Sequence, residues 1–119
     1  MSSHREKRRE DRIRFSWPLW FGYHENGQLF RGQVVDLSRS AVSFTVDDEH
    51  CPELGQHILT RFSYPHSTND GFDMGSYFHW SEVIRLGHTH TGKNHVALRF
   101  HQPLPSDPAA TAQMALQPA

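Results

Sequence analysis

Short runs in which apolar and polar residues alternate constrain the fold of this chain more than any other feature. Between Ala41 and Val46, three apolar residues alternate with Ser43 and Thr45, which is the period of a strand with one face on a core. Because no segment has a long helical period, the pattern predicts a small all-β barrel of six short strands with turns about every ten to fifteen residues. The expected strands are Ser16–Tyr23, Gln28–Leu37, Ala41–Val46, Gln56–Tyr64, Phe72–Leu86 and His95–His101.

The connections between these runs carry their own signals. Asn26-Gly27, within His24–Gly27, predicts a hairpin turn between the first two strands. The segment Pro65–Gly71 is polar and is interpreted as a loop, whereas Phe72–Leu86 is long enough for a bent or bulged strand. In the second strand, Leu29, Arg31, Gln33 and Val35 are expected on one face, against Phe30, Gly32 and Val34.

Length and charge indicate a single domain with two distinct ends. The 119 residues are enough for one small core. Residues 1–14 hold six Lys/Arg against three acids, although the whole chain has a net charge of -1. We therefore expect a basic N-terminal arm over 1–14, a barrel over 15–102 and a Pro/Ala-rich C-terminal tail over 103–119, disordered or forming a short helix.

The chain carries no sign of export or membrane insertion. Its single cysteine, Cys51, cannot form an internal disulfide. No apolar run approaches the roughly 18 residues of a membrane span, and the charged N-terminus lacks the apolar region of a signal peptide. These features predict a cytoplasmic protein without direct membrane insertion.

Two short motifs suggest recognition of guanine and phosphate. Arg8 and Arg12 are four residues apart, and guanidinium groups fit both phosphates and the O6/N7 edge of guanine. Asp36 and Ser38, two apart at a strand end, point to one side. The carboxylate could accept both donors on the Watson–Crick edge of guanine, which adenine does not offer.

The segment Glu6-Lys7-Arg8-Arg9-Glu10-Asp11-Arg12-Ile13 resembles the RxxxR motif that opens PilZ domains. The segment Asp36-Leu37-Ser38-Arg39-Ser40-Ala41 resembles their second motif, [D/N]xSxxG, and follows in the same order. The resemblance covers roughly residues 5 to 101 and includes the last two strands, through Glu82-Val83-Ile84-Arg85 and Val96-Ala97-Leu98-Arg99-Phe100. Arg5 and Arg9 have the same spacing, but the basic pair Lys7-Arg8 and the strand directly after Arg12 favour Arg8 and Arg12.

The resemblance implies a six-stranded antiparallel barrel that acts as a receptor for the bacterial second messenger cyclic di-GMP and needs no cofactor. It implies that the ligand orders the N-terminal arm and that the signal passes to a protein partner. The implied ligand-binding residues are Arg8, Arg9, Arg12, Asp36, Ser38 and Ala41. Ala41 replaces the motif glycine, and its methyl group would cost on the order of 1 kcal/mol where positive φ or close ligand approach is required. The alternative is a degenerate PilZ-like interaction module that does not bind the ligand.

Other functions have weaker support in the sequence. A small barrel with a basic arm and aromatic residues could bind single-stranded nucleic acid, but the acidic body disfavours this. His88, His90 and His95 suggest a zinc site, but the residues between them are interpreted as the tip of a hairpin. No cysteine or nearby acid completes the set of ligands, so no metal is expected. Cys51 lacks a defined base and no phosphate-binding loop is present, so we do not expect an enzyme. Arg39 and Arg85 could add positive potential near the ligand site, but they are interpreted as solvated residues at strand edges.

Overall fold

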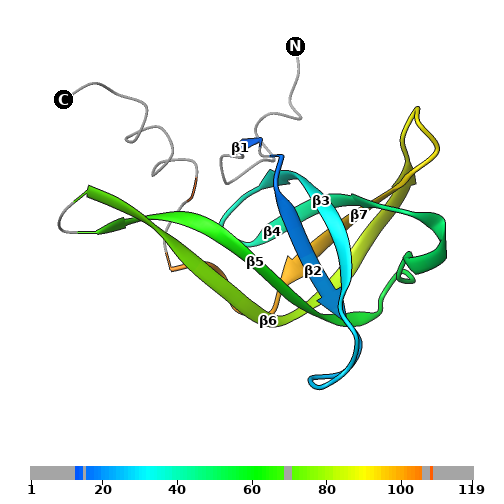
Figure 1. The fold of residues 1–119 in the computed structure, drawn as a ribbon, viewed down its shortest axis with the longest axis horizontal. Coiled ribbons are helices and arrows are strands. Elements are labelled where there is room, and N and C mark those ends of the chain that lie inside the picture. The colour runs from blue at the N-terminus through cyan, green and yellow to red at the C-terminus, as the bar shows by residue number, and fades with distance from the viewer. Residues whose placement is uncertain (1–12, 15, 69–70, 106–107, 109–119) are drawn as a thin grey trace, which may run out of the picture.

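The computed structural model describes residues 13–14, 16–68, 71–105 and 108. Strands dominate this part of the chain (Figure 1), together with one 3-10 helix at Asp48–His50. The strands are β1 (Ile13–Arg14), β2 (Pro18–Gly22), β3 (Phe30–Leu37), β4 (Ala41–Val46), β5 (His57–Thr68), β6 (Gly71–His88) and β7 (Asn94–Phe100).

Six of the strands close into a barrel. Their order is β3-β2-β5-β6-β7-β4, every pairing is antiparallel, and β3 also pairs with β4 to complete the ring. The short β1 adds to β3 outside this ring. The predicted six-stranded antiparallel barrel is therefore confirmed.

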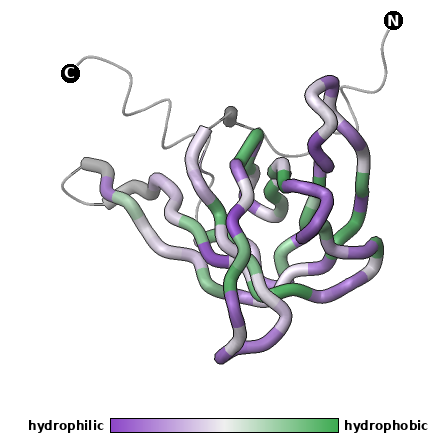
Figure 2. The backbone as a smooth tube through the Cα atoms, turned by 45° about the vertical axis from the view of Figure 1, so that its right-hand side comes forward, coloured by the Kyte–Doolittle hydropathy of each residue, from purple (hydrophilic) through white to green (hydrophobic). Residues whose placement is uncertain are grey.

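The core follows the alternation seen in the sequence, and apolar and polar segments alternate along the backbone in Figure 2. Val42, Phe44 and Val46 of β4 are all buried, as are Val96, Leu98 and Phe100 of β7. Because Phe44 occupies the space beside Gly32, a Cβ atom there would lie 2.5 Å from the Phe44 ring. Gly32 thus lets β3 pack closely against an aromatic core residue.

The β5–β6 hairpin continues past the barrel, where the sequence predicts a loop. Pro65 pairs with Met74, and the ladder runs on to Thr68 opposite Gly71, so the two strands project to one side (Figure 1). The loop prediction for Pro65–Gly71 was wrong because a backbone ladder does not require alternating apolar side chains. A proline is tolerated there when its nitrogen faces the open edge of the strand.

The chain after β7 returns to the barrel. The backbone N–H of Leu104 donates to the carbonyl oxygen of Arg39 at 2.8 Å, and the Leu104 side chain is fully buried in the core. The Tyr77 hydroxyl donates to the Gln102 carbonyl oxygen at 2.6 Å. Packing thus extends beyond residue 102, into the segment interpreted from its composition as a tail; most of 103–119 lies outside the described residues.

Candidate ligand-binding site

A bulge in β3 sets the direction of Asp36. The register with β4 shifts between Val34 and Asp36, which makes Val35 the extra residue. Val34 and Leu37 are both buried in the core, although residues three apart on a regular strand face opposite sides. The bulge therefore turns the Asp36 carboxylate to the outer face, whereas unbroken alternation would direct it inward with Gly32 and Val34.

A second bulge acts in the same way on β6. Here the register with β7 shifts between Val83 and Arg85, so Ile84 is the extra residue. Val83 is buried in the core, and Arg85 is exposed on the outer face. This bulge confirms the prediction of a bent or bulged strand over Phe72–Leu86.

The two bulges align a row of side chains across four strands, with Asp36 at one end and Arg85 at the other. Asp36 is paired with Ser43, Ser43 with Ala97, and Ala97 with Arg85. Ser43 donates a hydrogen bond from Oγ to Oδ1 of Asp36 at 2.9 Å. The residues enclose a hollow of about 80 Å³, which we call the bulge hollow, lined by Asp36, Ser38, Ala41, Val42, Ser43, Ile84, Arg85 and Ala97.

The described residues of the second motif thus come together. Ser38 lies at the corner between β3 and β4, where its backbone N–H and its hydroxyl both donate to the carbonyl oxygen of Ala41, at 2.8 Å and 3.3 Å. Ala41 begins β4, and no non-glycine residue in the described part of the chain has positive φ. The methyl group of Ala41 therefore carries no left-handed backbone strain, and any cost for a ligand would be steric.

The first motif lies outside the described residues, but the strand that follows it does not. Arg8, Arg9 and Arg12 precede Ile13, the first residue of β1. Ile13 is paired with Leu37 and Arg14 with Asp36. Therefore β1, which follows the segment with the three arginines, lies beside the second motif.

Arg39 and Arg85, interpreted from the sequence as solvated residues, are exposed and also lie near the second motif. Arg39 is exposed, but its Nε donates to the carbonyl oxygen of Leu104 at 3.0 Å, so it fastens the segment after β7 to the corner. Arg85 lines the bulge hollow and places a positive charge opposite Asp36. The basic residue after Ile84 was a visible signal, but its direction depends on the bulge.

The remaining sequence candidates stay apart from this site. Within the described part of the chain, no three metal-ligating side chains gather, and no helix is long and apolar enough to cross a membrane. Burial and the nearby charge of Asp48 raise the pKa of the Cys51 thiol, which keeps it protonated at neutral pH.

Comparison with solved structures identifies the same barrel in other proteins. The inhibitor of motility MotI/DgrA of Bacillus subtilis superposes with a TM-score of 0.67 at 11% identity, over 90% of this chain and 47% of its own length. This chain therefore spans about half of that protein. The PilZ domain of Escherichia coli YcgR, solved with c-di-GMP, matches with a TM-score of 0.50 at 14% identity, over 92% of this chain and 86% of that one.

A second YcgR structure, also with c-di-GMP, has a TM-score of 0.49 at 17% identity, over 92% of this chain and 43% of that one. No match was found among curated proteins. The family model of the PilZ domain matches residues 6–115, which is nearly the whole sequence. The chain belongs to the PilZ domain family.

Proposed function

We propose that this protein is a cytoplasmic receptor for cyclic di-GMP that signals to a protein partner. Asp36 would pair with the Watson–Crick edge of a guanine, and Ser38 would bind alongside it. Arg8 and Arg12 would clamp the phosphates and guanine bases, with Arg9 as an accessory phosphate contact. Each such charge-assisted contact contributes about 1.5–3 kcal/mol.

The observation that carries the proposal is the position of β1. Because Arg14 is paired with Asp36, the strand that directly follows Arg12 in the sequence runs beside the carboxylate. The two motifs, 24 positions apart from Arg12 to Asp36 in the sequence, can therefore act on one ligand. Family membership and the c-di-GMP bound to the YcgR PilZ domain support the choice of ligand.

The bulge hollow also offers an electrostatic reason for the ligand class. It has Asp36 at one end and Arg85 at the other, with the small side chains of Ser43 and Ala97 between them. In a guanine nucleotide, the base presents donors to a carboxylate, and the phosphate presents negative charge to a guanidinium. We propose Arg85 as a further contact on the phosphate side.

Arm ordering is the proposed signal. Neutralisation of Arg8 and Arg12 by the two phosphates would fold the arm over the ligand and create or hide a surface for the partner. Hydrogen exchange of residues 1–14 should slow when cyclic di-GMP is added. Unchanged exchange at saturating ligand would rule out this mechanism but leave ligand binding intact.

Isothermal titration with cyclic di-GMP and cyclic di-AMP tests the ligand. We expect binding of cyclic di-GMP only, weakened about tenfold or more in Arg8→Ala and Arg12→Ala. Arg5→Ala is the matched control, because Arg5 belongs to the competing register with Arg9. Equal affinity for the two dinucleotides, or no binding of either, would contradict the proposal.

Ala41→Gly separates this proposal from a degenerate interaction module. Because the Ala41 backbone is extended within β4, we expect only a modest gain in affinity, by less than about tenfold, which is about 1.4 kcal/mol. A protein that binds cyclic di-GMP only after this substitution would be a degenerate module, with its site blocked by one methyl group.

A further inference from the structure

A second row of side chains crosses the outer face of β3, β2, β5 and β6. Arg31 is paired with Trp20, Trp20 with Arg61, and Arg61 with Phe78. All four are exposed, with 36% of Trp20 and 51% of Phe78 accessible to solvent. Directly paired residues have Cβ atoms about 4.5–5.5 Å apart, so cations and aromatic rings alternate along one line, here called the outer row.

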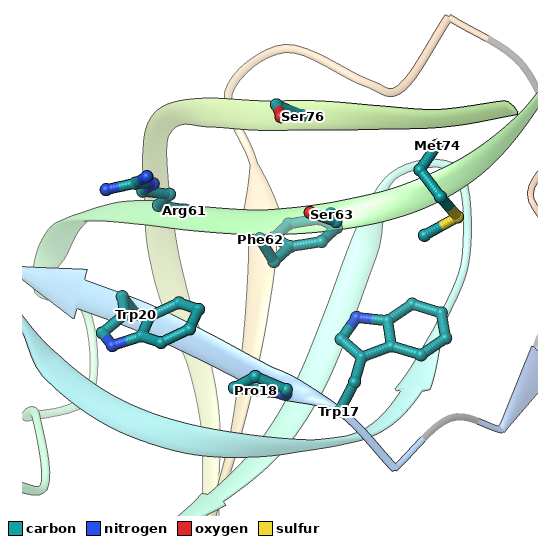
Figure 3. Close-up of a pocket in the computed structure, with 8 residues that line it drawn as sticks. All are labelled: Trp17, Pro18, Trp20, Arg61, Phe62, Ser63, Met74 and Ser76. Atoms are coloured by element: carbon teal, nitrogen blue, oxygen red, sulfur yellow. The ribbon is translucent and has the colours of Figure 1, made fainter.

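Two hollows flank the centre of the outer row. One, of about 410 Å³, is lined by Trp17, Pro18, Trp20, Arg61, Phe62, Ser63, Met74 and Ser76. Figure 3 shows Trp17 and Met74 toward one end of this hollow and Trp20 and Arg61 toward the other. The second, of about 300 Å³, is lined by Trp20, Leu29 and Arg61. Trp20 and Arg61 thus line both hollows.

Within the described residues, little negative charge lies near the outer row: Asp47 lines a separate hollow with Arg31, and its ion-pair partner there is Lys93. Neither of the two hollows beside Trp20 is lined by an acidic residue, and within the described residues neither Arg31 nor Arg61 forms an ion pair. Positions two residues away along each segment face the same side, and none of them is acidic: Leu29, Gln33, Pro18, Gly22, Leu59, Ser63, Ser76 and Trp80. This local excess of positive charge stands out in a chain with a net charge of -1.

We propose that the outer row is a docking surface for an acidic segment of a partner protein that also carries apolar or aromatic side chains. Carboxylates of the segment would pair with Arg31 and Arg61, while its apolar side chains enter the hollows on the two sides of Trp20. The charge complementarity selects this occupant, because an acidic segment neutralises two arginines that have no ion-pair partner among the described residues, and a basic or neutral segment does not. Exposed Trp and Arg are also the residue types that dominate binding energy at protein interfaces.

This inference goes beyond the proposed ligand and does not depend on it, because the outer row and the bulge hollow share no residue. The probe is a fluorescein-labelled random copolymer of glutamate and tyrosine, titrated with the protein of residues 1–119 and followed by anisotropy. We expect binding that weakens with salt and falls by about tenfold or more in Trp20→Ala and in Arg61→Ala.

Matched variants separate this surface from other positive charge on the chain. Arg99→Ala removes an exposed arginine of β7 and should leave copolymer binding within about twofold of the original. Asp36→Asn should weaken the binding of cyclic di-GMP and leave the binding of the copolymer unchanged. Trp20→Ala and Arg61→Ala should weaken the binding of the copolymer and leave that of cyclic di-GMP unchanged. Far-UV circular dichroism and thermal unfolding check that each variant folds, and Trp20→Phe, which keeps an aromatic ring, should retain most of the binding.

Several outcomes would overturn the proposal. The first is no binding of the copolymer, and the second is binding by Trp20→Ala and Arg61→Ala that is as tight as that of the original protein. The third is binding that is lost in Arg8→Ala but kept in Arg61→Ala, which would assign the binding to the basic arm. Tighter binding of oligothymidylate than of the copolymer, lost in the same outer-row variants, would instead make the row a nucleic-acid surface.

Discussion

The outer row and the bulge hollow are built from the same kind of sheet, yet they differ in register. Across the outer row, the pairings of Arg31, Trp20, Arg61 and Phe78 continue without a shift. Around the bulge hollow, both flanking strands shift register, at Val35 and at Ile84. The regular region displays large side chains on an open face, whereas the bulged region turns opposite charges toward a small space.

The difference teaches how one barrel can keep the two proposed binding surfaces apart. Large exposed aromatic side chains provide contact area but little selectivity among similar partners, and they suit a protein surface. A bulge re-aims single side chains without changing the rest of the strand, so Asp36 and Arg85 can be set at the two ends of one row. We expect substitutions in the two regions to act independently, and the following predictions test this.

Leu104→Ala should produce the largest effect, on the stability of the whole barrel and on the bulge hollow, but not on the outer row. Its side chain is fully buried, so truncation should lower the free energy of unfolding by about 2–5 kcal/mol. The backbone N–H and carbonyl oxygen of Leu104 are bonded to Arg39 at the corner. Because the lost side-chain packing should loosen this attachment, affinity for cyclic di-GMP should fall as well, whereas copolymer binding should not. Chemical denaturation measures the first effect, with the exposed Leu54→Ala as a control expected to change stability by less than about 0.5 kcal/mol.

Asp36→Asn tests whether the bulge hollow recognises its ligand independently of the outer row. The amide keeps an oxygen that can accept from Ser43 but loses the charge and one of the two acceptors offered to guanine. We expect cyclic di-GMP affinity to fall by about tenfold to a hundredfold, which is about 1.4 to 3 kcal/mol. Arg61→Ala should leave this affinity unchanged, and a comparable loss in both variants would mean that the two surfaces are coupled.

Tyr77, whose hydroxyl donates to the Gln102 carbonyl oxygen in the segment after β7, should make the free energy of unfolding depend on pH in the alkaline range. Burial is the main cause that raises its pKa from the ordinary 10.0 to about 12, although its hydrogen bond to Gln102 opposes the shift. The unfolded chain therefore loses this proton first, so stability is fully present below pH 10 and declines as the pH rises from 10 to 12. Tyr77→Phe should reduce this decline while costing about 0.5–1.5 kcal/mol at neutral pH through the lost hydrogen bond. Denaturation at several pH values tests both effects, and an equal alkaline decline in the two proteins would contradict this assignment.

The Glu82–Arg99 ion pair should have the smallest effect. Arg99 donates to Oε1 of Glu82 at 2.7 Å, and this hydrogen bond lowers the pKa of the carboxyl group from 4.5. A lowered pKa stabilises the fold above 4.5, and the contribution is lost as the pH falls through the value in the folded protein. Both side chains are solvated, so the effect is screened. Unfolding of Glu82→Gln and the original protein should differ only slightly at neutral pH and converge in acid; a difference that grows in acid would contradict this prediction.

Much of the barrel could be predicted because single-face burial has a period that the sequence displays. The alternating apolar residues of β4 and β7 gave correct strands and a correct core face, and Ala41–Val46 matches β4 at both ends. The continuation of β5 and β6 through Pro65 could not be predicted in this way, because its stability comes from backbone pairing rather than from side-chain pattern. The burial of Leu104 could not be predicted either, because a single apolar residue between prolines forms no periodic pattern.

The candidate site was only partly predictable. The motif spacing suggested that Asp36 and Ser38 act together, and both line the bulge hollow. The role of Arg85 could not be derived, because its direction depends on a one-residue shift at Ile84 that no local sequence pattern specifies. The outer row was missed for a different reason: Trp20 lies in an aromatic-rich segment that resembles core, and only the pairing with Arg31 and Arg61 identifies its exposed face.

The two hydrogen bonds between Arg39 and Leu104 also make this protein suitable as an optical sensor. They hold the chain at Leu104 against the corner that carries Ser38, so a dye attached at the exposed Pro105 would start from a defined position. With Cys51 replaced by serine, a Pro105→Cys variant would offer a single thiol for labelling. A change in dye emission on addition of the dinucleotide would then convert occupancy of the corner into a signal that can be read in real time.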